Sequence, residues 1–255
     1  DKNRIYTFGK NYDKLKVINF KENGIDIDFN DFKVISSENP TIYRNKNDIY
    51  FQKGGKILQI KNVDAKTFEE INGRSYLDNK YYRDKNNVYY DFQKIEGADI
   101  KTFEPDGYSI GKDKTGVYYK THKINGIDVN STEVLENEFY KDKNNIYYRN
   151  KKLENFKPEN FEVISSSLVG QNEDFYYFTE DENNNTKFIL LENKNVDAET
   201  FEVLDEEYTK DKNNAYYKGK ILKGVDVKTL DIYYNKSDNG YKIKDKNKVY
   251  KIVNN

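Results

Sequence analysis

The chain has 255 residues, and its 43 Lys and Arg against 44 Asp and Glu give a formal net charge of −1. This near-zero balance argues against general binding to nucleic acid, because neutralising phosphates takes an excess of basic side chains. With one His and no Cys, the chain lacks thiol nucleophiles, disulfides, Cys-ligated metals and multi-His metal sites. No apolar run approaches the roughly 18 residues that a membrane-spanning helix needs, so we expect no membrane span.

Since the sequence begins at Asp1 and not at Met, we expect a mature or trimmed product, from which a signal peptide or lipid anchor would already be gone. Hydrophobic residues make up only 36% of the chain, which by itself would favour disorder. The 24 Tyr and 15 Phe point the other way, because each aromatic side chain can bury about 150–250 Å². We therefore expect a folded protein with an aromatic core.

A seven-residue segment repeats along the chain. Asp84-Lys-Asn-Asn-Val-Tyr-Tyr90 recurs as Asp142-Lys-Asn-Asn-Ile-Tyr-Tyr148 and Asp211-Lys-Asn-Asn-Ala-Tyr-Tyr217, with Asp113-Lys-Thr-Gly-Val-Tyr-Tyr119 as a variant. Weaker copies begin at Asp1, Asn45, Gln171 and Asp245, so the eight copies start at residues 1, 45, 84, 113, 142, 171, 211 and 245. Repetition of this kind is the signature of a repeat architecture, and we predict a single repeat domain over residues 1–255.

A second element lies between copies. It reads Val63-Asp-Ala-Lys-Thr-Phe-Glu69, Ala98-Asp-Ile-Lys-Thr-Phe-Glu104, Val196-Asp-Ala-Glu-Thr-Phe-Glu202 and, more loosely, Val225-Asp-Val-Lys-Thr-Leu-Asp231. Its Asp suits the N-cap of a helix, where a side-chain oxygen accepts a backbone N–H. The element therefore predicts a single helical turn followed by a short strand, such as residues 161–164 or 201–204.

Each unit reads as a small antiparallel meander of three or four short strands. In the unit around Asp142, a strand over residues 138–141 enters a turn at 143–145, where Asn tolerates the left-handed conformation that hairpin turns require. The return strand covers 146–149, and a second tight turn at 150–151 leads to a strand that ends near Leu153. In sister units, residues 54–55 and 219–220 occupy this second turn.

The return strand has a two-faced pattern. The fifth residue of the segment is apolar and the sixth is Tyr in every copy, while the seventh loses its aromatic ring only at Thr7 and Lys251. Because neighbouring strand residues point to opposite faces, the fifth and seventh residues share one face and the Tyr occupies the other. Both faces are apolar, which predicts sheets that stack face to face.

The predicted fold is all-β: tandem antiparallel β-meander or hairpin repeats stacked in an open, solenoid-like array, with a β-propeller as the alternative. Propeller blades take about 40–50 residues, whereas the copies at 84, 113, 142 and 171 lie only 29 residues apart. The polar Thr7 and Lys251 also favour the open array, because its end units expose a face to water.

The repeated segment resembles the DKNYY repeat family of bacterial proteins along nearly the whole chain, most closely at Asp84, Asp142 and Asp211. Asn45 and Gln171 depart from the family pattern, since the leading Asp is missing there. The resemblance implies a bacterial origin and often an envelope or exported location, and it carries no catalytic residues over. We accordingly expect an extracytoplasmic protein, located in the periplasm, on the cell surface or in the medium.

The clustered oxygens of Asp84, Asn86 and Asn87, and of their copies, have two interpretations. Calcium prefers such ligands, but the EF-hand pattern needs Gly at position six and Glu at position twelve, where this sequence has Tyr89 and Ile95. We therefore interpret the segment as a hairpin turn in which the Asp side chain accepts local N–H groups, and we expect no metal or other cofactor.

His122 and two acidic clusters are the remaining candidates for chemistry. No Gly-x-Ser-x-Gly segment accompanies His122, so we interpret it as part of a tight turn. Two carboxylates about 5–10 Å apart can hydrolyse glycosides, and acidic residues cluster at 180–182 and 206–207. Since acidic residues are scattered throughout the chain, we interpret both clusters as solvated loops and predict no catalytic residue.

The repeated Tyr could stack on sugars or contact proteins, but its period predicts a place in the core. The candidates for exposed binding residues are therefore Tyr side chains outside the motif: Tyr81, Tyr108, Tyr140 and Tyr233.

Together these features predict a non-catalytic binding or interaction module of a bacterial envelope or secreted protein, which docks a protein or glycan partner on its repeat surface. The alternatives are an immunity or inhibitor protein that occludes a toxin, a glycan-active enzyme with a carboxylate pair, and a structural spacer.

Overall fold

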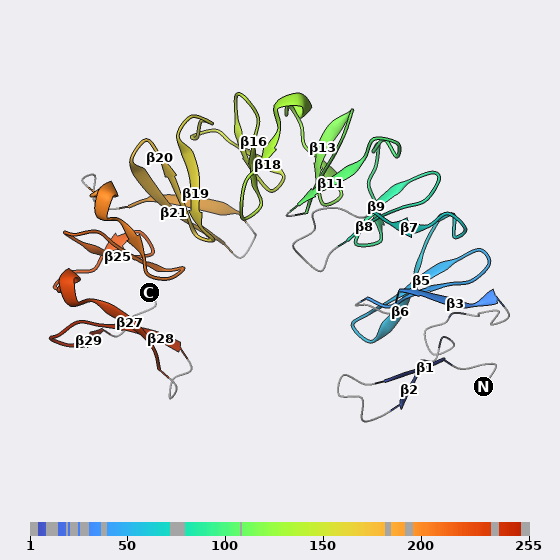
Figure 1. Cartoon of the computed structure of the whole chain (residues 1–255), viewed down its shortest axis with the longest axis horizontal. Helices are drawn as coiled ribbons and strands as arrows, with labels where there is room; N and C mark the ends of the chain where they lie inside the picture. Colours follow the sequence, from blue (N-terminus) through green and yellow to red (C-terminus); the bar gives the residue numbers. More distant parts are fainter. Residues whose placement is uncertain are drawn as a thin grey trace. The chain divides into compact units, whose positions relative to one another are not determined.

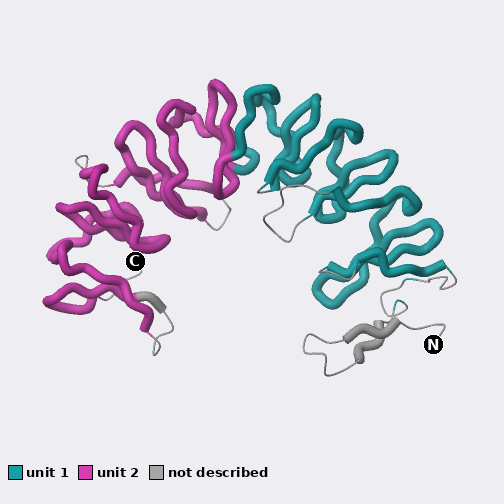
Figure 2. Tube along the Cα trace, in the orientation of Figure 1, with its two compact units in different colours: residues 1–134, 149–151 teal, residues 135–148, 152–255 magenta. Residues whose placement is uncertain are grey.

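The computed structural model describes residues 5–8, 15–18, 20, 25, 31–36, 40–71, 80–107, 109–181, 185–191, 196–235 and 240–250, with the backbone alone at 5–8, 15–18 and 240–241. The chain forms two compact units, which Figure 2 colours separately. Unit 1 comprises residues 1–134 and 149–151, and unit 2 comprises residues 135–148 and 152–255.

Unit 1 is built from short antiparallel strands that pair in chain order (Figure 1). A hairpin of β1 (Ile5–Phe8) and β2 (Leu15–Ile18) comes first. Three four-stranded meanders follow: β3 (Lys33–Ser36), β4 (Ile42–Arg44), β5 (Ile49–Lys53) and β6 (Lys56–Ile60); β7 (Glu69–Glu70), β8 (Tyr81–Arg83), β9 (Val88–Tyr90) and β10 (Gln93–Lys94); β11 (Glu104–Gly107), β12 (Ile110–Asp113), β13 (Gly116–Tyr119) and β14 (His122–Lys123). The 3₁₀ turn η3 (Val129–Ser131) and β15 (Glu133–Val134) end the unit.

Unit 2 repeats this construction. β16 (Phe139–Lys141) and β17 (Ile146–Tyr148) form a hairpin, and β18 (Lys151–Leu153) lies at the unit boundary. Two four-stranded meanders and a three-stranded sheet follow, with 3₁₀ turns before the last two: β19 (Phe161–Ser165), β20 (Leu168–Gln171), β21 (Asp174–Glu180) and β22 (Thr186–Leu190); η4 (Ala198–Thr200), β23 (Glu202–Val203), β24 (Tyr208–Lys210), β25 (Ala215–Tyr217) and β26 (Lys220–Ile221); η5 (Val227–Thr229), β27 (Asp231–Asn235), β28 (Gly240–Lys244) and β29 (Val249–Tyr250).

The leading Asp of the repeated segment closes the first hairpin turn with its side chain. Asp84 Oδ1 accepts the backbone N–H groups of Asn86 and Asn87, both at 2.7 Å. The same pair of bonds forms at Asp113, Asp142, Asp211 and Asp245, and Asn45 keeps it through its own Oδ1. The turn is thus closed by hydrogen bonds to this side chain and does not need the left-handed Asn that the sequence suggested.

The left-handed conformation therefore belongs to the second tight turn, and placing it at Lys143–Asn145 was wrong. Neither Asn144 nor Asn145 has a positive φ, because Asp142 holds their N–H groups in a right-handed turn. In the second turn, φ is 54° at Arg149 and 48° at Lys218. That turn also begins one residue earlier than predicted, directly after β17 and β25.

The second oxygen of the same Asp ties its hairpin to the capped turn that begins the sheet. Asp84 Oδ2 accepts the hydroxyl of Tyr89 at 2.8 Å and the backbone N–H of Asp64 at 2.7 Å. Asp113, Asp211 and Asp245 do the same with the Tyr five residues later and with Asp99, Asp197 and Asp226. Four donors thus converge on one buried carboxylate, which offers about four acceptor positions and no donor when ionised.

The predicted capped turns are present. Asp64, Asp99 and Asp197 each accept the backbone N–H three residues later, and Asp226 accepts that of Lys228. The Lys that follows the buried Asp pairs with the capping carboxylate in four repeats: Lys85 with Asp64 at 2.7 Å, Lys114 with Asp99, Lys212 with Asp197, and Lys246 with Asp226. Asp128 caps η3 in the same manner, a copy that the sequence analysis missed.

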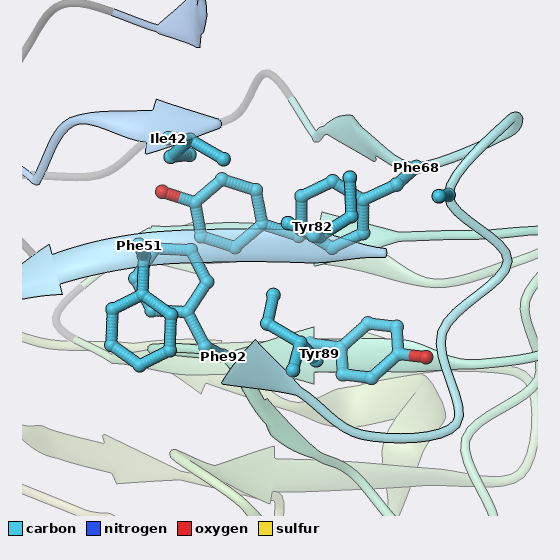
Figure 3. Close-up of a cluster of buried hydrophobic side chains, with 9 residues drawn as sticks. Ile42, Phe51, Phe68, Tyr82, Tyr89 and Phe92 are labelled. Atoms are coloured by element: carbon cyan, nitrogen blue, oxygen red, sulfur yellow. The ribbon is translucent and has the colours of Figure 1, made fainter. Parts of the chain in front are cut away.

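Successive sheets pack face to face within each unit, as the two-faced pattern predicted. Ile49 and Phe51, the fifth and seventh residues of one copy, contact the cluster that holds Tyr89, the sixth residue of the next (Figure 3). The ring of Phe51 stacks on Phe92 with centroids 4.0 Å apart, and Phe68 stacks on Tyr82 at 5.3 Å. The same succession joins four further pairs of sheets within the units: Val88 and Tyr90 with Tyr118, Ile146 and Tyr148 with Tyr176, Tyr177 with Tyr216, and Ala215 with Tyr250.

The core is therefore aromatic, and the all-β fold of tandem antiparallel meanders is confirmed. The sixth-position Tyr50, Tyr89, Tyr118, Tyr147 and Tyr216 are buried, while Tyr176 and Tyr250 are half-buried. In the described part of the chain every sheet keeps two edge strands, so none closes into a barrel. The side chain of Thr7 and the whole of Lys251 lie outside the described residues. The single domain over residues 1–255 and the choice between open array and propeller stay predictions.

Replacing Asp84 by Ala leaves the backbone N–H groups of the turn and of Asp64 and the hydroxyl of Tyr89 without their acceptor. We expect the free energy of unfolding to fall by roughly 3 kcal/mol, since unsatisfied buried donors each cost about 1–3 kcal/mol. Asp84→Asn should lose less, because Asn45 shows that an amide oxygen still closes the turn. Denaturant unfolding followed by circular dichroism measures both, with exposed Lys56→Ala as the control; equal losses in all three variants would contradict the role of the carboxylate.

The stability of the protein should fall at both ends of the pH scale. Hydrogen bonds from Lys85 and Thr67 lower the pKa of Asp64 to about 2, so its stabilising effect is present above the unfolded pKa of about 4 and is lost as the pH falls towards 2. Burial and then Asp142 raise the pKa of Tyr147 to about 12, so its contribution is full below about pH 10 and is lost between 10 and 12. Denaturant titrations across pH should show a plateau between these limits; constant stability from pH 4 to pH 2 would contradict the acid branch.

Candidate binding cavity

In three sheets an ion pair joins the first two strands at the same position. Glu69 lies opposite Arg83 in the register of β7 and β8, and the two side chains pair at 2.7 Å. Glu202 pairs with Lys210 at 3.2 Å, and Asp231 with Lys244 at 3.5 Å, in the same register. The basic residue stands directly before the repeated segment, and it is Arg or Lys in six of the seven copies that have a preceding residue: Arg44, Arg83, Lys112, Lys141, Lys210 and Lys244.

The copy that begins at Gln171 departs from this arrangement. Glu162 of β19 lies opposite Gly170 of β20, so its strand neighbour has no cationic side chain. Glu162 makes no ion pair with any described residue, and its side chain is exposed. Beside it, Gln171 takes the place of the buried Asp and reaches back, donating from Nε2 to Lys157 O at 2.6 Å.

These departures coincide with a cavity of about 680 Å³ in unit 2. Its walls come from β19, β20, the turn between β20 and β21, and the capped turn of the following repeat. The lining residues are Asn160, Glu162, Ile164, Gly170, Gln171, Asn172, Glu173, Asp174, Phe175, Ala198 and Phe201. A volume of this size lies within the range of about 300–1,000 Å³ that ligand sites occupy.

The lining combines an aromatic surface with hydrogen-bond acceptors. Phe175 and Phe201 stack with ring centroids 4.1 Å apart, and both are half-buried. Phe175 is the fifth residue of its copy, where the other copies have Ile, Val or Ala. Glu162, Glu173 and Asp174 bring three carboxylates, and none of them pairs with a described cation. The cavity is thus a negatively charged pocket beside flat apolar rings.

A smaller hollow in unit 1 occupies the corresponding place. Its volume is about 380 Å³, and its lining includes Ile35, Arg44 and Phe68, which correspond to Ile164, Gly170 and Phe201. There Arg44 extends across to the next capped turn and donates from Nη1 to Ala65 O at 3.4 Å. Ala65 corresponds to Ala198 of the larger cavity. An arginine side chain therefore occupies in unit 1 the space that Gly170 leaves open in unit 2.

The turn residues Asp84, Asn86 and Asn87 behave as hairpin formers, since both carboxylate oxygens of Asp84 accept hydrogen bonds from the protein. Among the described residues no group of three or more His, Asp or Glu side chains is placed to hold a metal ion. The helices of this same part of the chain are all too short or too polar to cross a membrane.

The structure separates the other predicted candidates from the cavity. His122 is exposed, and its assignment to a tight turn was wrong: it begins β14 and lies opposite Tyr119, after the turn at 120–121. Glu180 accepts the hydroxyl of Tyr148 at 3.2 Å, Asp181 accepts the N–H of Asn185 in the β21–β22 turn, and Glu182 lies outside the described residues. Glu206 is exposed and Glu207 pairs with Lys218 at 2.7 Å, so this cluster belongs to the β23–β24 turn.

Two of the four Tyr predicted to be exposed are instead core residues. Tyr81 is 4% exposed and donates its hydroxyl to Ser109 O, and Tyr140 is fully buried with its ring stacked on Tyr147. Both lie on the strand that pairs with the strand of the repeated Tyr, opposite Tyr90 and Tyr147. Tyr233 is half-buried with Lys244 over its ring, and Tyr108 lies outside the described residues.

The cavity residues were not predicted as a site, although the sequence carries a signal for them. The copy that begins at Gln171 lacks the leading Asp, and it has Gly where the six other copies have Arg or Lys directly before the segment. Two such departures in neighbouring residues, with Phe175 as a third, mark this copy as different from its sisters.

Fold and repeats define a tandem β-meander repeat protein whose meanders are each built around a hairpin with a buried Asp–Tyr hydrogen bond in most repeats. The chain belongs to the DKNYY family, whose sequence model matches residues 1–122 and 111–253. A search of the curated proteins and a search of the solved structures each found no match.

The backbone conformation at residue 170 does not require glycine, so we expect Ala to be tolerated there. Its φ lies outside the left-handed region, and an added Cβ would meet the movable end of Ile164, Cδ1, at 3.1 Å. Gly111 on β12 is the matched control, because a Cβ there would lie 2.3 Å from the ring of Phe103. We expect Gly111→Ala to lower the free energy of unfolding by about 1–3 kcal/mol through overpacking, and Gly170→Ala to change it by less than half of that. Thermal and denaturant unfolding measure both; equal destabilisation would show that Gly170 serves packing.

Proposed function

We propose that this protein is a non-catalytic binding module of a bacterial envelope or secreted protein, which docks a protein or glycan partner on its repeat surface. The observation that carries the proposal is the cavity of about 680 Å³. It lies at the one described repeat that has a glycine, Gly170, in place of the basic residue across from the first strand. In the unit 1 sheet that begins at Glu69, Arg83 and its ion pair take this position, whereas here polar and aromatic groups face open space.

The chemistry of the lining supports binding. Phe175 and Phe201 offer stacked rings, and Asn160, Gln171 and Asn172 offer amides in a pocket that two neighbouring repeats form together. Amphipathic recognition of this kind, with flat apolar surface beside a few placed polar groups, is typical of ligand sites. Rigid repeats hold such surfaces in place without the moving parts that many enzymes need.

The envelope or secreted setting rests on the family resemblance, and it has a direct test. Fractionation of cells that express the full gene product, followed by immunoblotting, should place the protein outside the cytoplasm. Recovery in the cytoplasmic fraction alone would contradict this part of the proposal.

A peptide array and a glycan array probed with the purified chain test the binding function. We expect at least one class of ligand to be retained and to be recovered with its mass unchanged. Phe175→Ala should reduce retention at least tenfold, because it removes one of the two stacked rings. Tyr234→Ala is the control, since Tyr234 is 48% exposed on β27, outside the cavity lining.

Other outcomes would favour the alternatives. A shortened glycan whose cleavage depends on Glu162 or Asp174 would indicate a glycan-active enzyme. Tight binding of one toxin with loss of its activity would indicate an immunity protein. If neither array retains the protein, or if Phe175→Ala does not reduce retention, the cavity is not the binding surface.

A further inference from the structure

We infer that the cavity at Gly170 accepts an arginine side chain from a basic segment of a partner polypeptide. The inference rests on the proposed binding function and names the partner's chemistry. The guanidinium enters between Glu162 and the Phe175–Phe201 pair, in the space that the protein's own Arg44 occupies in the corresponding hollow of unit 1.

The register of the strands supplies the first step. In three sheets the acidic residue of the first strand pairs with a basic side chain of the second at this position, as Glu69 pairs with Arg83. In the β19–β20 pair, Glu162 keeps the acidic residue of this ion pair, but Gly170 stands where the basic residue would be. The site thus lacks one cation that its sister sites contain, and a ligand can supply it.

The charge of the lining supplies the second step. Three carboxylates, those of Glu162, Glu173 and Asp174, line the cavity, and its lining contains no Lys, Arg or His. Such a pocket attracts a cation and disfavours phosphate, sulfate or an acidic peptide. A neutral sugar would leave these charges without a counterion.

Gln171 supplies the third step, independently of the acidic residues. Its side chain is 8% exposed, and both hydrogen bonds of its Nε2 go to the backbone, at Lys157 O and Glu159 O. These bonds fix the amide plane, and Oε1 accepts no hydrogen bond from any described residue. An acceptor held in this way at the cavity wall can receive a donor from a ligand, and a guanidinium has five N–H groups.

Arginine fits the site better than lysine for a geometric reason. The planar guanidinium stacks on aromatic rings and donates in several directions, whereas an ammonium is a compact point charge. The half-buried rings of Phe175 and Phe201 offer the stacking surface. Ala198, which lines the cavity, corresponds to Ala65, whose carbonyl accepts from Arg44 in unit 1.

Two substitutions separate this inference from a general acidic attraction. Gly170→Arg supplies the missing side chain within the protein and fills the space, and Glu162→Gln removes the opposing charge. Glu69→Gln is the matched control, because Glu69 holds the same register position in unit 1, where Arg83 pairs with it. Unfolding measurements check that each variant remains folded, and Gly170→Arg restores the pattern of the sister repeats.

The probe is the blocked peptide acetyl-Gly-Arg-Arg-Gly-amide, with its lysine and citrulline counterparts, titrated by isothermal calorimetry into the full chain. We expect the arginine peptide to bind at least tenfold more tightly than the citrulline peptide and several-fold more tightly than the lysine peptide. Gly170→Arg should weaken its binding at least tenfold, Glu162→Gln several-fold, and Glu69→Gln not at all. Added salt should weaken it further, because the attraction is electrostatic.

The inference is overturned if Gly170→Arg binds the arginine peptide as the unaltered chain does, or if citrulline binds equally well. A glycan that binds in the cavity and is displaced by Gly170→Arg, while no arginine peptide binds, overturns the inference but leaves the proposed binding function standing. If no ligand of any class binds in the cavity, both the arginine inference and the proposed binding function are contradicted.

Discussion

The structure depends on one interaction, the burial of an aspartate side chain that accepts four hydrogen bonds. Asp84 closes its own hairpin through Oδ1 and joins Tyr89 to the capped turn at Asp64 through Oδ2. Burying a charge is costly unless it is hydrogen-bonded, and four converging donors meet that requirement. Because the donors come from the hairpin and from the preceding capped turn, one side chain fixes the geometry of a whole meander.

The aromatic core follows from this constraint. With the hydroxyl of Tyr89 held by Asp84, the ring is directed at the preceding sheet, where Ile49 and Phe51 receive it. A tyrosine suits the place because it has an apolar body and a polar tip. A chain with only 36% hydrophobic residues can therefore stack small sheets, since the repeated rings cover both faces of each one.

The two copies that lack the leading Asp differ in how far their structure departs from the repeat. Asn45 also lacks the leading carboxylate, but its amide oxygen still closes the turn, so the change is structural and mild. At Gln171 the longer side chain turns away from the hairpin, while Gly170 removes a cation and Phe175 adds a ring. These changes face one cavity, and together they alter its charge, its size and its apolar surface.

The sequence alone determined the repeat, the antiparallel meanders, the capped turns and the two-faced Tyr strand, because these depend on neighbours within a few residues along the chain. It placed Tyr81 and Tyr140 outside the core, and only the tertiary structure showed that both are buried, on strands that pair with β9 and β17. The cavity likewise needed the tertiary structure. Glu162 meets Gly170 only through strand register, and Phe201 comes from the next repeat, so no local pattern could bring them together.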